Sequence, residues 1–412
     1  VPAPEDDLPP GELPDQALGF RVGGYGMTKF TDLFTNRQLV ALITFSDLIG
    51  EARARAVSDG ASPSYADAVA SYLAFALSRT LNKNSSVGGW DSSTKVEGVR
   101  GVFARQAISM VWDFGEANPF AGAGGDLVED LNWVARVLEH LLVGPRGEVH
   151  QTDASARSYA GALVSTDPPY YDNIGYADLS DFFYVWLRRS LRDIYPGLLS
   201  TMLVPKTEEL VANPFRLEGK DKAKEFFERG FREVFARARQ SARPDFPITV
   251  YYAFKQSDSD EKGQASTGWE TLLEGMIRSG WAVTGTWPLR SEMGNRMRSF
   301  DSNALASSIV LSLRPRPDDA STIDRRGFIA ALEAELPGAL RRLEQGQVAP
   351  VDLPQAAIGP GMAVFSRYAG VLEPDGEKMT VRSALSRINE ILDQVLNEQE
   401  GDFDTTTRFA LA

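Results

Sequence analysis

The sequence predicts an α/β fold in which a mostly parallel sheet is covered by helices on both faces and carries an antiparallel hairpin at one edge. Through the middle of the chain, strand-like segments alternate with segments of helical periodicity, which is typical of parallel sheets. The last two strand-like segments, residues 281–287 and 304–313, have no helix between them, so we expect them to pair antiparallel. Of the 412 residues, 43% are hydrophobic and 24% are charged, as in ordinary globular proteins.

The chain begins with a linker and three helices. Residues 1–16 are acidic and rich in proline, and the first residue is not Met, so we expect a segment upstream to be missing. Apolar residues then recur at helical spacing over 32–58 and 65–81. A polar connection rich in Gly and Ser, residues 82–101, leads to a third helical pattern over 128–142.

The later elements alternate in type before the hairpin. In the order strand, strand, helix, strand and helix, they cover residues 147–154, 161–166, 222–239, 246–255 and 269–279. The C-terminal part reads as helices over 324–344 and 380–398, with a loop rich in Gly and Pro between them. We therefore expect a mainly helical region over 17–145, an α/β core over 146–320 and a helical region over 321–412.

The composition excludes several classes of site. The chain has no Cys, which removes thiol nucleophiles, disulfides and the usual structural zinc sites, and two His residues are too few for a His-rich metal site. No segment approaches the roughly 18 apolar residues that span a bilayer, and the N-terminus has no signal-peptide pattern. We therefore expect a cytoplasmic protein with no metal and no membrane partner. The net charge of −13 restricts nucleic-acid contact to a local basic patch.

A four-residue motif, Asp167-Pro168-Pro169-Tyr170, directly follows the buried strand-like segment 161–166. Ligands of open parallel sheets bind at the carboxyl ends of strands, and the two prolines stiffen this turn through their fixed φ. Asp167 and the carbonyl of Pro168 can accept both hydrogens of an exocyclic amine on a planar base, while Tyr170 can stack on the ring. Accepting those hydrogens keeps electron density on the nitrogen, whose lone pair can then attack a methyl sulfonium in line, without a covalent intermediate.

This motif resembles the catalytic motif of S-adenosylmethionine-dependent DNA methyltransferases that modify exocyclic amines, in the form associated mainly with N6 of adenine. The longer stretch from Thr166 to Ser190 is similar to the large bacterial adenine-specific DNA methylases that carry a domain of unknown function and a zinc-knuckle region. Further similar segments are residues 250–255, 267–270, 286–290 and 303–308. The resemblance covers most of the predicted sheet and implies a Rossmann-like methyltransferase sheet, S-adenosylmethionine as the cofactor and DNA as a partner.

The resemblance also indicates cofactor-binding residues. Thr35 lies at a predicted helix start, where backbone N–H groups attract a carboxylate, and a similar Phe-Thr element opens the cofactor-binding helix in many such methylases. Asp153 and Asp167 are further candidates; a plain helix cap is the alternative for Thr35 and for Asp153. The family's Gly-rich cofactor loop has only a partial match, residues 118–124, which lacks the acidic first residue. We therefore expect the C-terminal part of a larger enzyme, with that loop in a missing N-terminal segment or a partner chain.

Candidate substrate-binding residues lie in and beyond the motif. Tyr171 lines the base pocket or packs in the core, and the sequence leaves these alternatives equal. Arg290, Arg296 and Arg298 lie where the two hairpin strands join, on the rim that a base has to pass, and we expect them to contact nucleic acid. Helical spacing predicts a core stripe formed by Phe182, Phe183, Val185 and Trp186.

Taken together, these features predict methyl transfer to N6 of adenine in DNA, with Asp167, Pro168, Pro169 and Tyr170 as the catalytic residues. The target adenine has to leave the duplex, because N6 cannot be reached inside the stack. Two alternatives stay open: a catalytically silent DNA-binding or regulatory module of a methylase or defence complex, and an enzyme that methylates RNA or another amine. The resemblance suggests a role in restriction-modification or defence against foreign DNA.

Overall fold

The computed structural model describes residues 8–94, 96–142, 144–171, 174–252, 267–290, 307–345 and 353–401. The chain forms two compact units, one from Val1–Gln151 and Tyr171–Ala223 and the other from Thr152–Tyr170 and Lys224–Ala412. We call them the helical unit and the sheet unit. This division differs from the expected ranges, because residues 171–223 group with the N-terminal helices and the C-terminal helices group with the sheet.

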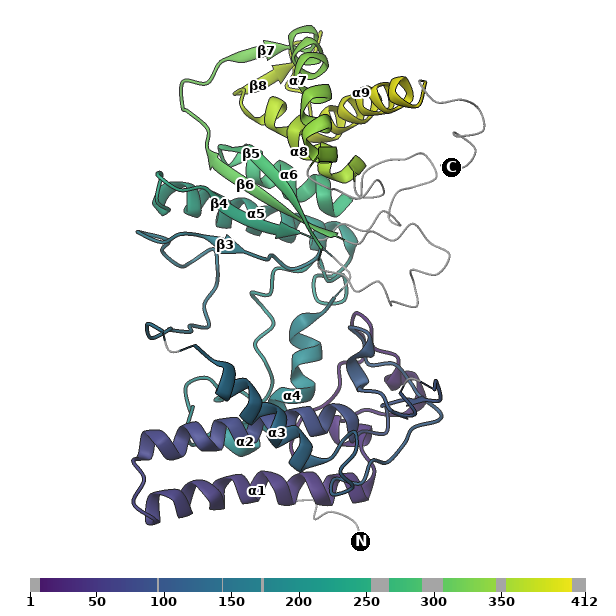
Figure 1. The fold of residues 1–412 in the computed structure, drawn as a ribbon, viewed down its shortest axis with the longest axis vertical. Helices are drawn as coiled ribbons and strands as arrows, with labels where there is room; N and C mark the ends of the chain where they lie inside the picture. The colour runs from purple at the N-terminus through teal and green to yellow at the C-terminus, as the bar shows by residue number, and fades with distance from the viewer. Residues whose placement is uncertain are drawn as a thin grey trace. The chain divides into compact units, whose positions relative to one another are not determined.

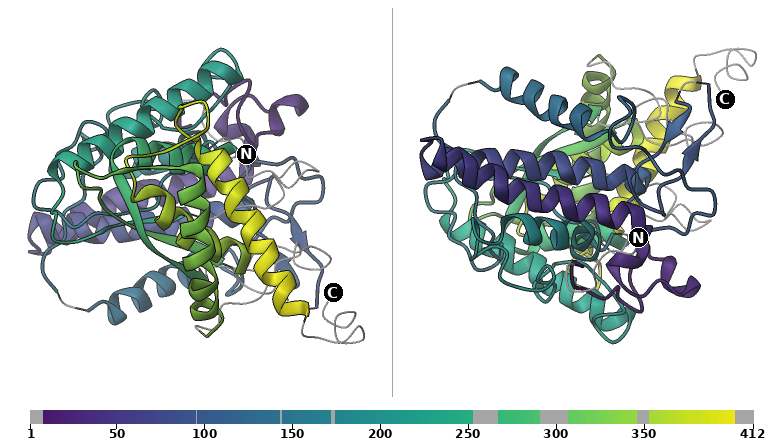
Figure 2. Two further views of the ribbon diagram at one scale, coloured as in Figure 1. Left: turned by 90° about the horizontal axis from the view of Figure 1, so that it is seen from above. Right: turned by 90° about the horizontal axis from the view of Figure 1, so that it is seen from below.

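The framework of the helical unit consists of α1 (Asn36–Ser58), α2 (Pro63–Lys83), α3 (Leu127–His140) and α4 (Tyr176–Leu191), shown in Figures 1 and 2. α1 and α2 form a hairpin and lie side by side in Figure 1 and in the right view of Figure 2; Pro63 occupies the first position of α2, where proline suits a helix. The three helices expected before residue 145 are thereby confirmed. Shorter elements are η2 (Val22–Tyr25), η3 (Phe30–Leu33), β1 (Trp90–Asp91), β2 (Gly98–Val99) and η4 (Val102–Ala104).

Aromatic side chains form the core between α4 and the start of α1. The ring of Phe34 stacks on Phe182 and meets Trp186 edge-on, with both centroid distances at 5.6 Å. Phe182, Val185 and Trp186 are buried, and Phe183 is half-buried. The predicted core stripe of α4 is therefore confirmed, and large aromatic rings of this kind supply much of the energy of a core.

Within the described residues, a four-stranded sheet forms the centre of the sheet unit (Figure 1). Its strands are β3 (Ser165–Thr166), β4 (Ile248–Tyr252), β5 (Trp281–Arg290) and β6 (Ser307–Pro315), in the order β3-β4-β6-β5. β3 pairs with β4 in parallel, whereas β6 pairs antiparallel with both β4 and β5. β3, β4 and β5 therefore run in one direction and β6 runs in the opposite direction.

This topology confirms the predicted edge hairpin and corrects two other expectations. β5 and β6 pair antiparallel, and β5 forms the edge. The sheet is mixed rather than mostly parallel, because the hairpin folds back and inserts β6 between β4 and β5. Residues 147–154, expected to form a strand, have no regular structure; the segment is largely polar, and Val149 is 99% exposed and so has no core to enter.

Two helices of the α/β alternation pack on the sheet as expected. α5 (Lys220–Ser241) carries a row of buried rings at every fourth position, Phe227, Phe231 and Phe235. The indole N–H of Trp281, the first residue of β5, donates to the carbonyl of Phe235 at 2.9 Å. α6 (Thr267–Arg278) comes immediately before β5 and buries its apolar face. Apolar periodicity thus predicts both helices correctly.

The sheet unit continues with β7 (Thr322–Asp324), α7 (Arg325–Gln345), α8 (Leu353–Ser366), β8 (Gly370–Leu372) and α9 (Val381–Gly401). The prediction of a loop between the last two predicted helices is wrong, because this part of the chain forms α8. A Cβ atom on Gly359 would lie 1.9 Å from Thr286 Oγ1 of β5, and one on Gly361 would lie 2.6 Å from Ile388 of α9. These glycines therefore let α8 pack closely against β5 and α9, and they do not form a turn. Across the described ranges, every helix is too short or too polar to cross a bilayer.

Candidate active site

The Asp-Pro-Pro-Tyr motif lies at the carboxyl end of β3 in the sheet unit. Thr166, the residue before Asp167, pairs with β4 in parallel register. Ile309 of β6 lies opposite both Tyr252, the last residue of β4, and Pro288 of β5. The carboxyl ends of β3, β4 and β5 therefore lie at the same end of the sheet, which is where parallel sheets bind ligands. The last backbone residues of β5 lie at this same end of the sheet as the motif.

The carboxylate of Asp167 is exposed, and among the described residues no hydrogen bond or ion pair engages it. The surrounding protein still removes part of its water, and this desolvation raises the pKa of Asp167 above the usual aspartate value. Pro168 and Pro169, which follow it, are half-buried. Both oxygens of Asp167 are therefore open to hydrogen bonds from a ligand.

Aromatic packing holds Tyr170 at the same edge. Its ring meets the ring of Tyr252 nearly at right angles, with centroids 5.8 Å apart. Tyr252 in turn stacks on Trp269 of α6 at 5.5 Å, and both of these side chains are buried while Tyr170 is half-buried. Two buried rings thus support the half-exposed one. Sequence reasoning did not single out Tyr252 or Trp269, although both lie in segments that carry the family resemblance.

Tyr171 belongs to the helical unit, so the boundary between the two units falls directly after Tyr170. The backbone carbonyl of Tyr171 accepts a hydrogen bond from the N–H of Ala212 at 2.7 Å. Its side chain is half-buried. The structure therefore ties the backbone of Tyr171 to the segment around Ala212, and the role of its ring in a base pocket stays a prediction.

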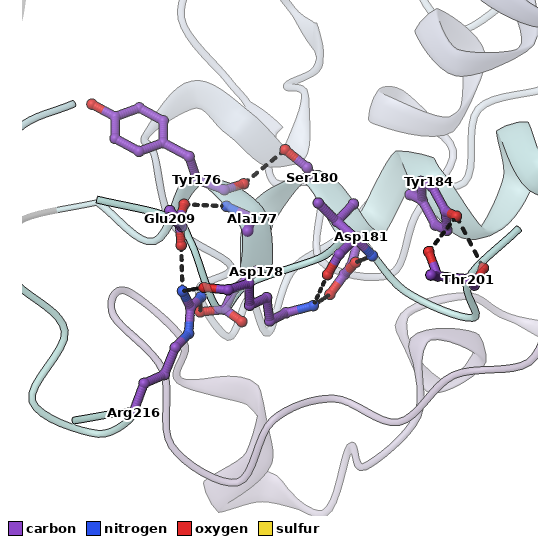
Figure 3. Close-up of polar contacts among 11 residues, drawn as sticks. Tyr176, Ala177, Asp178, Ser180, Asp181, Tyr184, Thr201, Glu209 and Arg216 are labelled. Carbon is purple, nitrogen blue, oxygen red and sulfur yellow. Dashed lines mark hydrogen bonds and ion pairs between the residues drawn. The ribbon is translucent and has the colours of Figure 1, made fainter. Parts of the chain in front are cut away.

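Buried ion pairs surround the start of α4 in the helical unit (Figure 3). Arg216 pairs with Asp178 at 2.5 Å and with Glu209. Glu209 also accepts the N–H of Ala177 at 2.7 Å. Gly175, the residue before the helix, has no side chain to cap it. Glu209 therefore supplies the negative charge that stabilises the N-terminus of α4.

Asp181, one turn further along α4, is fully buried and pairs with Lys206 at 2.7 Å, while its other oxygen accepts the N–H of Val204 at 2.7 Å. Burial raises the pKa of Asp181 in spite of these partners. Burial alone would lower the pKa of Arg216, but its two acidic partners raise it above the usual arginine value. Sequence reasoning missed this cluster; its signal was two acids, Asp178 and Asp181, within the apolar pattern of α4.

Thr35 caps α1 in the helical unit, as the helix-cap alternative predicts, and its role in cofactor binding stays a prediction. Its Oγ1 accepts the N–H of Gln38 at 3.3 Å, and Gln38 Oε1 accepts the N–H of Thr35 at 2.8 Å, so the two residues form a capping box. The Thr35 hydroxyl also donates to the carboxylate of Glu116. Arg37 pairs with the other oxygen of that carboxylate at 2.5 Å. An internal carboxylate thus lies at the N-terminus of α1.

A pocket of about 240 Å³ lies beside this cap. Its walls come from the first turns of α1, the end of α2 and the segment that includes Asn118. Gln38, which is only 5% exposed, contributes to the lining, and its Nε2 has no hydrogen-bond partner among the described residues. The structure therefore brings the first turn of α1, through Arg37 and Gln38, and the first two residues of the partial Gly-rich match, Asn118 and Pro119, into one pocket of the helical unit.

The partial Gly-rich match, residues 118–124, folds back on itself. The backbone and side-chain oxygens of Asn118 accept the N–H groups of Ala121 (3.2 Å) and Phe120 (3.0 Å). The N–H of Gly122 donates to Asp126 at 2.7 Å, and this bond is the main cause of the lowered pKa of Asp126. The first N–H groups of the loop are therefore satisfied internally and do not form a cradle for a ligand.

The remaining predicted site residues are Asp153, a cofactor candidate, and the three arginines expected to contact nucleic acid. Asp153 is exposed, and its two carboxylate oxygens accept the N–H and the hydroxyl of Ser155, each at 2.8 Å. Asp153 thus closes a local turn; no helix follows it in the described residues 154–171, so the helix-cap alternative is wrong, and contact with a cofactor stays a prediction. Arg296, Arg298 and the side chain of Arg290 lie outside the described residues.

Comparison of the chain with protein-family models, curated proteins and solved structures finds no match.

Proposed function

We propose that this chain is the C-terminal part of an S-adenosylmethionine-dependent enzyme that methylates N6 of adenine in DNA. The observation that carries the proposal is the carboxylate of Asp167 at the carboxyl end of β3, which has no partner among the described residues and is followed by two prolines and a supported aromatic ring. This arrangement offers two acceptors and one stacking surface, which is what a planar base with an exocyclic amine requires. A buried, ion-paired aspartate at this position would have argued for a purely structural turn.

The strand order supports the proposed methyltransferase-like sheet. β3, β4 and β5 share one direction, and the reversed strand β6 forms the edge hairpin with β5. The resemblance implies a Rossmann-like methyltransferase sheet, and the antiparallel edge hairpin is expected because no helix separates the last two strand-like segments. The motif and the last residues of β5 lie at the same end of the sheet, the carboxyl end of its parallel strands, where such sheets bind ligands.

In the proposed mechanism, an adenine that has left the duplex stacks on Tyr170. Its N6 donates one hydrogen to Asp167 and the other to the carbonyl of Pro168, which keeps the nitrogen lone pair available as the nucleophile. The new N–C bond would form as the bond between the methyl carbon and the sulfonium sulfur breaks, with its electron pair leaving on the sulfur as a neutral thioether; N6 then loses a proton, and the Asp167 carboxylate would take it. The rigid prolines hold both acceptors in position, and orientation of this kind supplies much of the rate gain.

When bound, S-adenosylmethionine supplies an electrophilic methyl group on a sulfonium. Donors that would fit the carboxylate of its amino-acid end lie at the start of α1: the hydroxyl of Thr35, the guanidinium of Arg37 and Nε2 of Gln38, which has no hydrogen-bond partner in the described part of the chain. Residues 118–124 use their first N–H groups internally. We therefore propose that another segment or a partner chain supplies the Gly-rich loop that the resemblance implies.

The test is transfer of a labelled methyl group from S-adenosylmethionine to matched substrates: duplex DNA, single-stranded DNA and RNA of the same sequence. The proposal predicts label in DNA that is recovered as N6-methyladenine after hydrolysis. Label in RNA alone would move the assignment to an RNA methyltransferase. DNA binding without transfer, together with no calorimetric signal for S-adenosylmethionine, would favour a silent binding module.

A further inference from the structure

The carboxylate of Glu116 occupies the N-terminus of α1. One oxygen accepts the Thr35 hydroxyl and the other pairs with Arg37 at 2.5 Å. The first N–H groups of an α-helix have no partner inside the helix and carry partial positive charge, so this end attracts an anion. Glu116 therefore serves as the internal anion of this position.

The pocket beside Glu116 contains a donor that the protein leaves unused. Only 5% of Gln38 is exposed. Its Oε1 accepts the Thr35 N–H, whereas its Nε2 has no hydrogen-bond partner in the described part of the chain. A buried unsatisfied donor costs about 1–3 kcal/mol, so an acceptor that enters the pocket is favoured. Arg37 also lines the pocket, and the Thr35 hydroxyl lies at the start of the same helix on the carboxylate of Glu116, so Gln38 belongs to a set of donors suited to a carboxylate.

The pocket size matches one end of a ligand. Its volume of about 240 Å³ is below the roughly 300–1,000 Å³ of sites that enclose a whole small molecule. Apolar side chains of α1, Ala41, Leu42 and Phe45, form one wall, and the remaining lining residues are Thr80, Asn84, Ala117, Asn118 and Pro119. A donor-rich end and an apolar wall fit the carboxylate and the aliphatic chain of a methionine-like group.

From this geometry we infer that Glu116 is a built-in competitor that closes the pocket, and that the carboxylate of an incoming methionine group displaces it from Thr35 and Arg37 and bonds to Gln38 Nε2. The identity of that ligand, the amino-acid end of S-adenosylmethionine, rests on the proposed function. Displacement makes cofactor entry and release of Glu116 one coupled step. The affinity for the cofactor is therefore set partly by the strength of the Glu116 contacts.

The test uses L-methionine and L-methioninol, which keeps the ammonium group and side chain but has an alcohol in place of the carboxylate. Saturation-transfer NMR titrations of both compounds are made on the full chain with three variants. Glu116→Gln removes the competing charge. Gln38→Glu keeps the oxygen that accepts the Thr35 N–H but replaces the donor Nε2 by an acceptor. Glu139→Gln removes one charge from an exposed position of α3 and is the matched control.

We expect Glu116→Gln to bind L-methionine roughly five- to tenfold more tightly than the wild type, and Gln38→Glu to bind it more weakly by a similar factor. L-methioninol should respond to neither change by more than about twofold, since it lacks the carboxylate. The control should equal the wild type. Weaker binding of L-methionine by Glu116→Gln would make Glu116 a ligand of the ammonium group and overturn the inference, as would no binding to any variant. Neither result bears on methyl transfer at Asp167, which its own variants test.

Discussion

Two acidic regions of this chain, one in each unit, use the same residue type in opposite ways. Asp178 and Asp181 in the helical unit are buried, and each is paired with a cation, Arg216 or Lys206. Asp167 in the sheet unit is exposed and has no partner among the described residues. Desolvation raises the pKa of both Asp167 and Asp181, so the shift alone does not separate a structural acid from a catalytic one.

The difference in partners does separate them. Every oxygen that a structural acid buries has to be compensated, because an unpaired buried charge costs several kcal/mol. The cluster around α4 meets this requirement with cations and backbone N–H groups. Asp167 sits at a strand end with its hydrogen-bonding capacity unused, and a ligand amine is the kind of group that uses it. The following predictions test this contrast, from the largest expected effect on free energy to the smallest.

Arg216→Ala should lower the free energy of unfolding of the helical unit by about 3–5 kcal/mol, since it leaves the buried carboxylate of Asp178 and the half-buried carboxylate of Glu209 without their shared cation. The measurement is chemical denaturation followed by circular dichroism. Arg105→Ala, which changes an exposed arginine of the same unit, is the control and should shift stability by less than about 0.5 kcal/mol. A loss as small as that of the control would show that the cluster is not a structural element.

The rate of methyl transfer should fall on acidification at a higher pH than an ordinary aspartate would give. Asp167 has to be ionised to accept the amine hydrogens, and its pKa is raised by desolvation. Below that pKa the rate should drop about tenfold per pH unit. A pH–rate profile checks this, with unfolding followed over the same range. A profile that stays flat down to the usual aspartate pKa would argue against Asp167 as the acceptor.

Asp181 should make the stability of the helical unit depend on pH in the opposite direction: the stability should fall as the pH rises, whereas the rate of methyl transfer should fall as the pH drops. Its pKa is raised in the folded state, so the folded protein holds this proton more tightly than the unfolded chain. The stabilisation is complete below the unfolded-state pKa of about 4 and is lost as the pH rises through the folded-state value. Relative to the wild type, Asp181→Asn should therefore gain stability from about pH 4 towards neutrality. The exposed Asp193→Asn is the control, and a difference independent of pH would contradict the prediction.

Asp167→Asn should have the smallest effect on stability, within about 0.5 kcal/mol of the wild type, because it removes no hydrogen bond or ion pair among the described residues. Thermal unfolding of the two proteins checks this. A loss of more than about 1.5 kcal/mol would assign Asp167 to the structural class of acids and remove the contrast.

Local patterns predict much of this fold. Helical periodicity locates α1, α2, α3, α5 and α6, and the stripe of α4 identifies core residues such as Trp186. The order of the strands depends on pairings between distant segments, so the insertion of β6 between β4 and β5 is not visible in any one of them. The glycines of α8 read as loop residues because their role, contact with Thr286 and Ile388, depends on partners far along the chain.

In the candidate site, too, the sequence predicts local features but not contacts between distant segments. The motif at Asp167 and the cap at Thr35 are short and contiguous, so the sequence alone locates them. The supports of Tyr170 come from another strand and another helix, and the partners of Asp178 and Asp181 come from a polar segment without periodicity. Glu116 lies 81 residues from Thr35, and nothing in its local sequence indicates that it reaches α1.

The most direct test of the central claim is the initial rate of labelled methyl transfer to adenine in DNA by the wild type, Asp167→Ala and the exposed control Asp193→Ala. If Asp167 accepts the N6 hydrogens, Asp167→Ala should lose roughly 10²- to 10⁴-fold in rate, with unfolding unchanged and the control near the wild type. A variant without Asp167 that still methylates adenine at the wild-type rate would contradict the account.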